Sequence, residues 1–403
     1  MFKIEKNHIM RVYLYTILMC LFIVSTSCAQ QNELKILPGA ENTQDYLPLL
    51  QGKSVGFVGN QSSLVGNQHL VDFLFAKNIK IQRIFSPEHG FRGVADAGEK
   101  IKNSKDVKTG ISIVSLYGKH FKPSKEEVQG IDVMVFDIQD VGVRFYTYIS
   151  TLHYVMEICA EQNIPLIVLD RPNPNAHYVD GPLLEKKYAS FVGMHPVPVV
   201  YGLTIGEYAK MINGEAWLKG SVKCDLTVIP CRNWNRNQIY DLPVKPSPNL
   251  PNSLSVALYP SLCFFEGTTV SAGRGTDYPF QCFGHPNMKN DGYSFTPRSI
   301  PGASKYPKFK GKVCYGYDLC SYNLVDFRNR KALDLSFLIK AYQQLQANKK
   351  FFNTFFRNLA GTNQLKLQIE KGMSEEDIRE SWQEDLKAYK NIRKKYLIYP
   401  DWE

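Results

Sequence analysis

The sequence lacks the short motifs that identify nucleotide-binding proteins and several common classes of hydrolase. No Gly-x-Gly-x-x-Gly follows the first predicted strand and no GxxxxGK[ST] loop occurs, which argues against a nucleotide cofactor. A Gly-x-Ser-x-Gly elbow is also missing, which argues against a lipase or esterase, and no HExxH pair occurs. Because CxxC and close His/Cys spacings are absent as well, we predict neither a metal site nor a cofactor.

Beyond its N-terminus the chain has no apolar stretch long enough to span a membrane. The run at 12–24 is shorter than the ~20 residues of a spanning helix. It follows basic residues and precedes small ones, so residues 1–28 are predicted to be a secretory signal. Cys28 lies in a relaxed lipobox pattern, which favours a lipid-anchored lipoprotein; cleavage before Gln30 is the alternative. We expect a periplasmic or secreted protein that contacts a membrane only through a lipid on Cys28, at the outer membrane.

What is present is the composition of an ordinary globular protein. Hydrophobic residues make up 44% and charged residues 21% of the 403 residues, which suits a chain of two domains. The formal net charge of +10 permits an anionic partner but names none, and we expect no nucleic-acid partner.

Short apolar runs alternate with helical patterns from about residue 53 to 232. Several runs are apolar at successive positions, as in strands that are covered on both faces. Thr204 and Glu207 form a capping-box pattern at the start of one helix. The runs cover 54–59, 79–86, 111–118, 131–138, 164–170, 197–202 and 224–231. This alternation predicts a Rossmann-like α/β fold with a doubly wound, mainly parallel sheet.

The chain divides into four predicted segments. After the signal at 1–28, residues 29–50 are expected to be a polar tether, residues 51–250 the α/β catalytic domain, and residues 251–403 a smaller C-terminal α+β domain that closes the cleft. The Pro- and Gly-rich stretch 243–300 is either a linker or a set of loops that face a ligand. Two strands are expected within 308–327, followed by helices at about 333–348 and 375–396.

Polar segments follow four of the predicted strands. In an open parallel sheet, ligands bind beyond the carboxyl ends of the strands, so we expect these side chains to converge on one cleft. The candidates for substrate binding there are Asn60, Gln61, His89, Arg92, Gln139, Arg144, Tyr146, Asp170, Arg171 and Asn173.

The carboxylates of these segments suit the cleavage of a glycosidic bond. This reaction needs a proton donor at the leaving oxygen and a group that stabilises the positive charge of the sugar. Glu88, which follows a buried strand and a proline, is the candidate acid; a loop carboxylate paired with Arg92 is the alternative. Asp137 and Asp140 are candidates for a base, a nucleophile or a group that orients the sugar, or they cap turns.

Two arginines are candidates for binding a carboxylate of the substrate. Arg171 follows Asp170 at a strand end, where a structural ion pair is the alternative. Arg274 lies in the glycine-rich segment 266–277, where glycines allow close backbone approach and a guanidinium can bind a carboxylate with two hydrogen bonds. A turn-rich hairpin is the alternative for this segment. Its other candidate site residues are Glu266 and Thr276.

Four long motifs follow one another along the chain: FSPEHGFRG, FDIQDVGVRFYTY, LDRPNP with DGPLLE, and EGTTVSAGRGTDYPF. In this order they resemble the exo-β-N-acetylmuramidase (NamZ-like) family of peptidoglycan-recycling glycosidases, over about residues 50–400. The resemblance implies a Rossmann-like domain, a smaller C-terminal domain and an active cleft between them. It places the catalytic glutamate at Glu88. Other polar positions of its motifs fall on Asp137, Gln139, Arg144, Asp170, Arg171, Glu266 and Arg274.

The resemblance also implies a substrate, namely peptidoglycan-derived muropeptides or disaccharides that end in N-acetylmuramic acid. The lactyl carboxylate of this sugar calls for an arginine in the cleft. Its 2-acetamido group can attack the anomeric carbon itself, or a protein nucleophile about 5 Å from the acid can do so, and the sequence leaves both open. The alternative function is a non-catalytic lipoprotein that binds cell-wall fragments.

Overall fold

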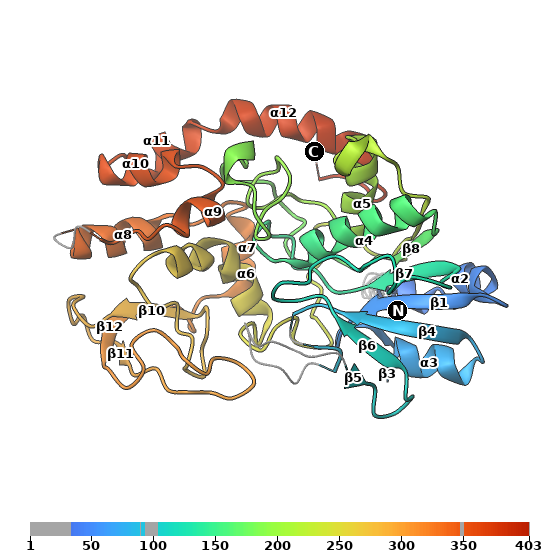
Figure 1. Ribbon diagram of the computed structural model, residues 1–403. Coiled ribbons are helices and arrows are strands. Elements are labelled where there is room, and N and C mark those ends of the chain that lie inside the picture. The colour runs from blue at the N-terminus through green and yellow to red at the C-terminus, as the bar shows by residue number, and fades with distance from the viewer. Residues whose placement is uncertain (1–33, 89, 93–103, 347–349, 403) are drawn as a thin grey trace, which may run out of the picture. The chain divides into compact units, whose positions relative to one another are not determined.

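The computed structural model describes residues 34–88, 90–92, 104–346 and 350–402, and from Leu37 onward these residues form one compact unit (Figure 1). A seven-stranded sheet runs through it in the order β5-β6-β4-β1-β7-β8-β9. All neighbouring strands are parallel except β5 and β6. The strands are β1 (Ser54–Gly59), β4 (Lys80–Ser86), β5 (Ser104–Lys105), β6 (Ser112–Ser115), β7 (Val133–Asp137), β8 (Leu166–Leu169) and β9 (Leu226–Ile229). The predicted Rossmann-like α/β fold is confirmed.

The central strands are apolar on both faces, which explains their position in the middle of the sheet. In β7, Val133 and Val135 belong to one hydrophobic core, whereas Met134 and Phe136 belong to a second core. Successive side chains of a strand point to opposite faces, so this division places one core on each side of the sheet. A run without polar alternation is therefore the pattern of a strand covered twice.

Helices cover both faces of the sheet. Helices α2 (Thr43–Leu50) and α3 (Leu70–Ala76) contribute to one core, and α4 (Tyr148–Gln162) and α5 (Ile205–Gly214) contribute to the other (Figure 1). The capping box predicted for α5 is confirmed: the hydroxyl of Thr204 accepts from the Glu207 N–H, and the Glu207 carboxylate accepts from the Thr204 N–H. The short β2 (Leu64–Val65) and β3 (Gln68–His69) pair beside α3.

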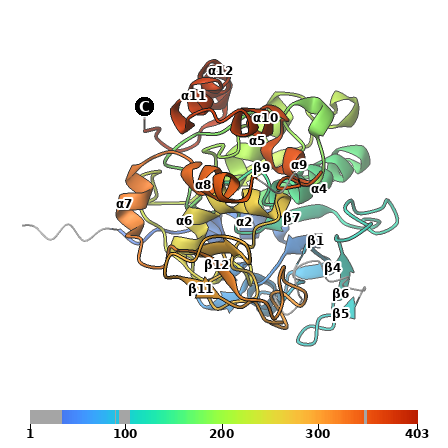
Figure 2. The same cartoon turned by 90° about the vertical axis from the view of Figure 1, so that its left-hand side faces the viewer.

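The chain after residue 250 has fewer strands and more helices than the part before it. It holds a three-stranded antiparallel sheet of β10 (Cys282–His285), β12 (Cys314–Asp318) and β11 (Ser294–Phe295). Figure 2 looks onto this side of the molecule. The helices are α6 (Ser253–Leu262), α7 (Leu324–Asn329), α8 (Ser336–Leu345), α9 (Phe356–Ala360), α10 (Gln364–Glu370), α11 (Glu375–Glu380) and α12 (Gln383–Arg393). Short 3-10 turns are η1 (Gly39–Glu41), η2 (Lys186–Tyr188), η3 (Lys219–Ser221), η4 (Cys263–Gly267) and η5 (Lys394–Tyr396).

Three predicted segments differ from the structure. The run 197–202 is buried but forms only isolated bridges, because Val200 pairs with single residues of two loops rather than with a strand. Within 308–327 the structure has one strand, β12, and the start of α7 instead of two strands. The described part of the predicted tether is folded, since η1 and α2 lie there and Tyr46 and Leu50 are buried.

The helix predicted at 375–396 is divided at Ser381 and Trp382 into α11 and α12. Across the described residues, no helix combines the length and the apolar character that crossing a bilayer requires. The domain boundary between residues 250 and 251 stays a prediction.

Candidate active site

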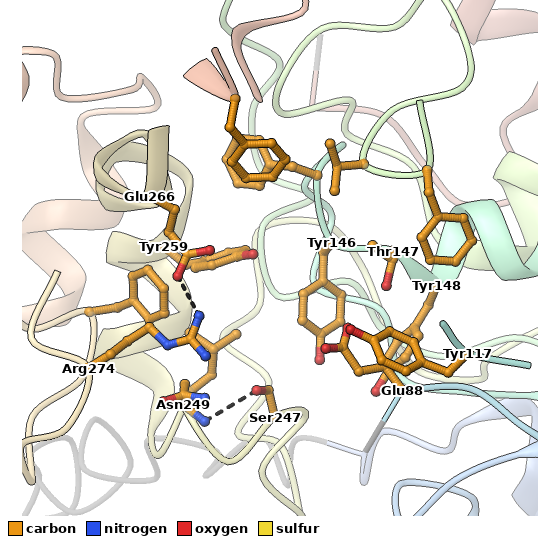
Figure 3. Close-up of a pocket in the computed structure, with 16 residues that line it drawn as sticks. Glu88, Tyr117, Tyr146, Thr147, Tyr148, Ser247, Asn249, Tyr259, Glu266 and Arg274 are labelled. Carbon is orange, nitrogen blue, oxygen red and sulfur yellow. Dashed lines mark hydrogen bonds and ion pairs between the residues drawn. The ribbon is translucent and has the colours of Figure 1, made fainter. Parts of the chain in front are cut away.

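A cavity of about 280 Å³ is lined by residues that follow the carboxyl ends of two neighbouring parallel strands. Glu88 comes just after β4, and Tyr117 comes just after β6. The loop before α4 adds Tyr146, and the opposite wall includes Tyr259 and Arg274 (Figure 3). The location agrees with the rule that ligands bind beyond the carboxyl ends of parallel strands.

Three charged side chains line this cavity among the described residues: Glu88, Glu266 and Arg274. Figure 3 shows Glu88 on one wall and the other two on the facing wall. The remaining lining residues are largely aromatic, which gives the cavity apolar faces between its charged groups.

Glu88 is half-buried and interacts with a group of tyrosines. Its carboxylate forms a hydrogen bond with the Tyr117 hydroxyl, and burial together with this negative charge raises the pKa of Tyr117. Burial raises the pKa of Tyr148 and Tyr259 as well, and the charge of Glu88 adds to both shifts. These phenols therefore remain protonated and can donate hydrogen bonds near neutral pH.

The position of Tyr148 in the cavity wall is set by Asn60, which the sequence predicted to bind substrate. Asn60 is fully buried at the end of β1, and its Nδ2 donates to the Tyr148 hydroxyl at 2.9 Å. The other side-chain atom, Asn60 Oδ1, accepts from the backbone N–H and the hydroxyl of Ser62 at 2.9 and 2.6 Å. Asn60 thus orients a lining tyrosine instead of facing the cavity.

One backbone carbonyl ties the proline-rich segment to the strand ends. The carbonyl of Pro246 accepts from the Tyr146 hydroxyl at 2.7 Å and from Gln61 Nε2 at 3.3 Å. This contact brings the neighbouring residues Ser247 and Asn249 to the cavity wall. Part of the stretch that the sequence left open as linker or ligand-facing loop therefore lines the cavity.

Glu266 and Arg274 form an ion pair at the border between two cavities. Arg274 Nη1 lies 2.6 Å from Glu266 Oε1, and each side chain keeps 28% of its surface exposed. Both residues also line a second cavity of about 260 Å³, together with Lys308 and Tyr306. Burial opposes the charged form of Arg274, but the Glu266 carboxylate outweighs this and raises its pKa. A charged guanidinium thus faces both cavities.

Asp137 and Arg171 do not reach the cavity. Arg171 donates from Nε and Nη2 to the two carboxylate oxygens of Asp137 at 2.5 and 2.8 Å, and both side chains are almost completely buried. The carboxylate raises the pKa of Arg171 despite the burial of both groups. The structure corrects the catalytic and carboxylate-binding roles expected here, because each group satisfies the other inside the protein.

Asp140 and Asp170 are also buried away from the cavity. Asp140 accepts from the Gly142 N–H at 2.7 Å and from the Tyr201 hydroxyl, and burial raises its pKa to about 6. Asp170 accepts from the Gly206 N–H at 2.8 Å near the start of α5, and burial raises its pKa to about 6 as well. Their hydrogen-bond partners assign them to structure rather than to chemistry.

Three further residues that were predicted to bind substrate form hydrogen bonds with backbone carbonyls instead. Gln139 Nε2 donates to the carbonyls of Asp140 and Pro172, and Asn173 Nδ2 donates to the carbonyl of Leu203. Arg144 is fully buried and donates to the carbonyls of Pro182, Val197 and Leu359. These contacts join loops that are far apart in the sequence.

Two more residues that were predicted to bind substrate, Arg92 and Thr276, do not line the cavity. Arg92 forms ion pairs with Asp72 and Asp106, each at 2.9 Å, so it does not pair with Glu88 as the alternative interpretation held. The Thr276 hydroxyl donates to the carbonyl of Gly273 within a turn. His89 lies outside the described residues.

Four predicted site residues therefore meet at one cavity: Glu88, Tyr146, Glu266 and Arg274. No sequence pattern indicated Tyr117, Ser247, Asn249 or Tyr259, which also line the cavity. The abundance of tyrosine and the proline-rich segment were the available signals, but neither identifies a single residue. The arrangement can offer a proton at one wall and bind an anionic group at the other.

The chain resembles known proteins over nearly its whole length. Residues 55–254 match the family model "Exo-beta-N-acetylmuramidase NamZ, N-terminal", and residues 257–399 match the C-terminal model of the same family. The peptidoglycan beta-N-acetylmuramidase NamZ of Bacillus subtilis (strain 168) is 40% identical over 373 residues, which cover 88% of this chain and 89% of that protein.

Two solved structures share the fold. One DUF1343 family protein from Bacteroides fragilis NCTC 9343 is 47% identical with a TM-score of 0.85, and the match covers 91% of this chain and all of that chain. A second protein of this description from the same strain is 30% identical with a TM-score of 0.77, covering 91% of this chain and 99% of that chain. The chain belongs to the exo-β-N-acetylmuramidase (NamZ) family and is a glycoside hydrolase.

Proposed function

We propose that this glycoside hydrolase is an exported enzyme that releases the non-reducing terminal N-acetylmuramic acid from peptidoglycan fragments during cell-wall turnover and recycling. Glu88 is the general acid. The observation that carries the proposal is the presence of Glu88 and Arg274 on facing walls of one cavity (Figure 3). The activity named for the Bacillus subtilis relative supports the same reaction here.

The chemistry of the sugar suits the two walls. C1 is separated by one ring carbon from C3, which carries the lactyl ether. With C1 beside Glu88, the lactyl carboxylate at the end of this ether can extend across the cavity to the facing wall, where Arg274 can bind it with its remaining N–H groups. A cavity of about 280 Å³ is at the small end of ligand pockets, which favours a single terminal sugar over a longer chain.

The proposed reaction starts with proton transfer from Glu88 to the glycosidic oxygen as its bond to C1 breaks. The 2-acetamido oxygen of the sugar attacks C1 and closes a five-membered ring between the acetamido group and C1. Water then attacks C1 and opens that five-membered ring, while the Glu88 carboxylate takes up a proton from the water. The 2-acetamido group is favoured as the nucleophile because Glu266, the other carboxylate of the described cavity wall, is engaged by Arg274. Progressive fluorination of the acetamide should then lower kcat.

A time course of product formation by NMR tests the proposed function. The wild-type protein is incubated with the disaccharide in which N-acetylmuramic acid is β-1,4-linked to N-acetylglucosamine. Free N-acetylmuramic acid with a retained β-anomer as the first product is the expected result. Saturable binding of the disaccharide without any product would instead support a non-catalytic binding protein and reject the proposal.

Export and anchoring form the second part of the proposal. The segment before Cys28 supplies the signal, and after its removal Cys28 becomes the lipidated first residue of a protein held at the outer membrane; both lie outside the described residues. Labelling with a fatty acid should mark the wild-type protein and leave Cys28→Ala unlabelled. A mature N-terminus at Gln30 in the wild-type protein would contradict lipidation and leave secretion as the route.

A further inference from the structure

A lysine from a distant loop holds the end of the helix that carries Glu266. Lys308 Nζ donates to the carbonyls of Phe265 and Thr268 at 2.8 and 2.7 Å. The same nitrogen lies 3.2 Å from the carbonyl of Val270 and 3.4 Å from that of Glu266. Four carbonyls of the segment 265–270 thus surround one ammonium group. This is a favourable place for a cation, because backbone carbonyls at the C-terminal end of a helix carry partial negative charge.

The contacts leave Lys308 little capacity to bind a ligand itself. An ammonium group has three hydrogens, and the carbonyls of the segment outnumber them. Lys308 lines the second cavity, and its charged end is turned onto the backbone carbonyls. The lysine therefore acts on the protein and not on the contents of the cavity.

The segment bound by Lys308 controls the position of the cavity arginine. Glu266 belongs to this segment, and its carboxylate holds Arg274 Nη1 at 2.6 Å. A shift of the segment moves Glu266 and weakens the ion pair that holds Arg274. We propose that Lys308 is a positioning residue that holds Glu266, and through it Arg274, where the carboxylate of the terminal sugar binds. The inference rests on the proposed function, in which Arg274 binds this carboxylate.

This role predicts a pH dependence of substrate affinity. Lys308 as a whole is exposed, but its Nζ is partly buried among the carbonyls. The loss of water around Nζ lowers the pKa of Lys308 to about 8, the charge of Arg274 acts in the same direction, and Glu266 and the Cys263 thiol oppose the shift. Among the described residues, these three are the groups whose charges act on Lys308. The pKa values of Arg274 and Cys263 are both raised, so neither group titrates near pH 8. As pH rises through 8, the ammonium loses a proton and one carbonyl loses its donor.

The test compares three variants on an aryl β-glycoside of N-acetylmuramic acid. Lys308→Met should raise KM about tenfold with little change in kcat, since hydrogen bonds to a charged group contribute to holding Arg274 and not to proton transfer. Lys308→Arg should restore most of the affinity. Lys310→Met, an exposed lysine of the same loop, is the matched control and should behave as the wild-type protein.

The pH profile separates this role from a purely structural one. The wild-type KM should rise above pH 8, the Lys308→Met KM should be flat between pH 7 and 9, and Lys308→Arg should move the rise to higher pH. A folded Lys308→Met protein with wild-type KM would overturn the inference. If that variant fails to fold, a wild-type KM that stays flat from pH 7 to 9 would overturn it.

Failure of the proposed function can be told apart from failure of the inference about Lys308. If the wild-type protein releases no N-acetylmuramic acid, the function is rejected, and calorimetric binding of free N-acetylmuramic acid then decides the inference. Binding that weakens about tenfold in Lys308→Met supports the positioning role. Equal binding by the two proteins overturns it.

Discussion

Two arginine–carboxylate pairs in this protein are alike in chemistry and opposite in use. Asp137 is the last residue of β7 and Arg171 lies just after the neighbouring strand β8, and at most 2% of either side chain is exposed. Glu266 and Arg274 lie at the border of the two cavities, and each keeps 28% exposed. Both pairs come from segments that the sequence marks as polar and functional. Burial, and not residue type, separates a structural pair from one that can meet a ligand.

The difference has an energetic reason. A pair without access to water must satisfy itself, because removing one partner leaves an uncompensated buried charge. A partly exposed pair keeps donors free for a substrate, and it contributes little to stability because water screens it. The ends of the central strands β7 and β8 therefore hold the fold together, while the cavity walls, which include residues after β4 and β6, keep charged groups that can meet a ligand.

The largest expected effect is on the rate of the Glu88→Gln variant. Loss of the general acid should lower kcat by about 10²–10⁴-fold on a 4-nitrophenyl glycoside of N-acetylmuramic acid. A 2,4-dinitrophenyl glycoside should lose less, because its better leaving group needs less protonation. Steady-state kinetics on both substrates measure the two losses.

Stability is the second readout for this variant. Because Glu88 lies at the cavity, Glu88→Gln should unfold within about 0.5 kcal/mol of the wild-type protein. Glu126→Gln, an exposed loop position, is the matched control for both measurements. Turnover of the 4-nitrophenyl glycoside at the wild-type rate would reject Glu88 as the acid.

The second effect concerns the buried pair. Asp137→Ala leaves the Arg171 guanidinium without its carboxylate, so the free energy of unfolding should fall by about 3–5 kcal/mol. Glu266→Ala removes the corresponding carboxylate at the cavity and should lower the free energy of unfolding by less than about 1 kcal/mol. Urea titration of the two variants measures the difference. Equal losses would show that the two pairs do not differ in the way their burial indicates.

The sequence predicted the sheet well where local pattern and tertiary role coincide. Strand β1 has the predicted bounds, because an apolar run covered on both faces has few other stable positions. The run at 197–202 is equally apolar and buried, yet only isolated bridges form there. An apolar run alone does not distinguish a buried strand from a buried loop, which is why the strand predicted at 197–202 is wrong.

The site was predicted in part for a related reason. The rule for parallel sheets locates the end of each strand and so found Glu88 and Tyr146. It does not say whether a side chain turns to the cavity or to the interior, and Asp137 and Asp170 turn to the interior. Tyr117 and Asn249 reach the cavity through loops whose course depends on contacts with distant segments, which no local pattern encodes.

The third effect tests what the exposed pair binds. Arg274→Ala should lower kcat/KM on the N-acetylmuramic acid glycoside by about 10–100-fold, the range of hydrogen bonds to charged groups. The N-acetylglucosamine glycoside, which has no lactyl carboxylate, should be affected much less. The ratio of the two kcat/KM values therefore measures the role of Arg274. An unchanged ratio would remove Arg274 from carboxylate recognition.

The smallest effect concerns a buried carboxyl group that has no cation beside it. Asp140 accepts from the Gly142 N–H and the Tyr201 hydroxyl, and burial raises its pKa to about 6 in the folded protein. The unfolded chain has an ordinary aspartate pKa of about 4. The folded state therefore binds the proton more tightly. The stability that this group contributes is complete below about pH 4 and is lost as pH rises through 6.

Asp140→Asn should remove this dependence, because the amide oxygen can accept the same two hydrogen bonds without a charge. The variant should gain on the order of 1 kcal/mol relative to the wild-type protein between pH 4.5 and pH 7. Urea titrations of both proteins at both pH values measure the change. The difference between the two proteins matters here, because Asp170, whose pKa is also raised to about 6, gives both the same background. Identical pH dependence would mean that Asp140 is already paired or solvated, and the contrast between central strand ends and cavity walls would weaken accordingly.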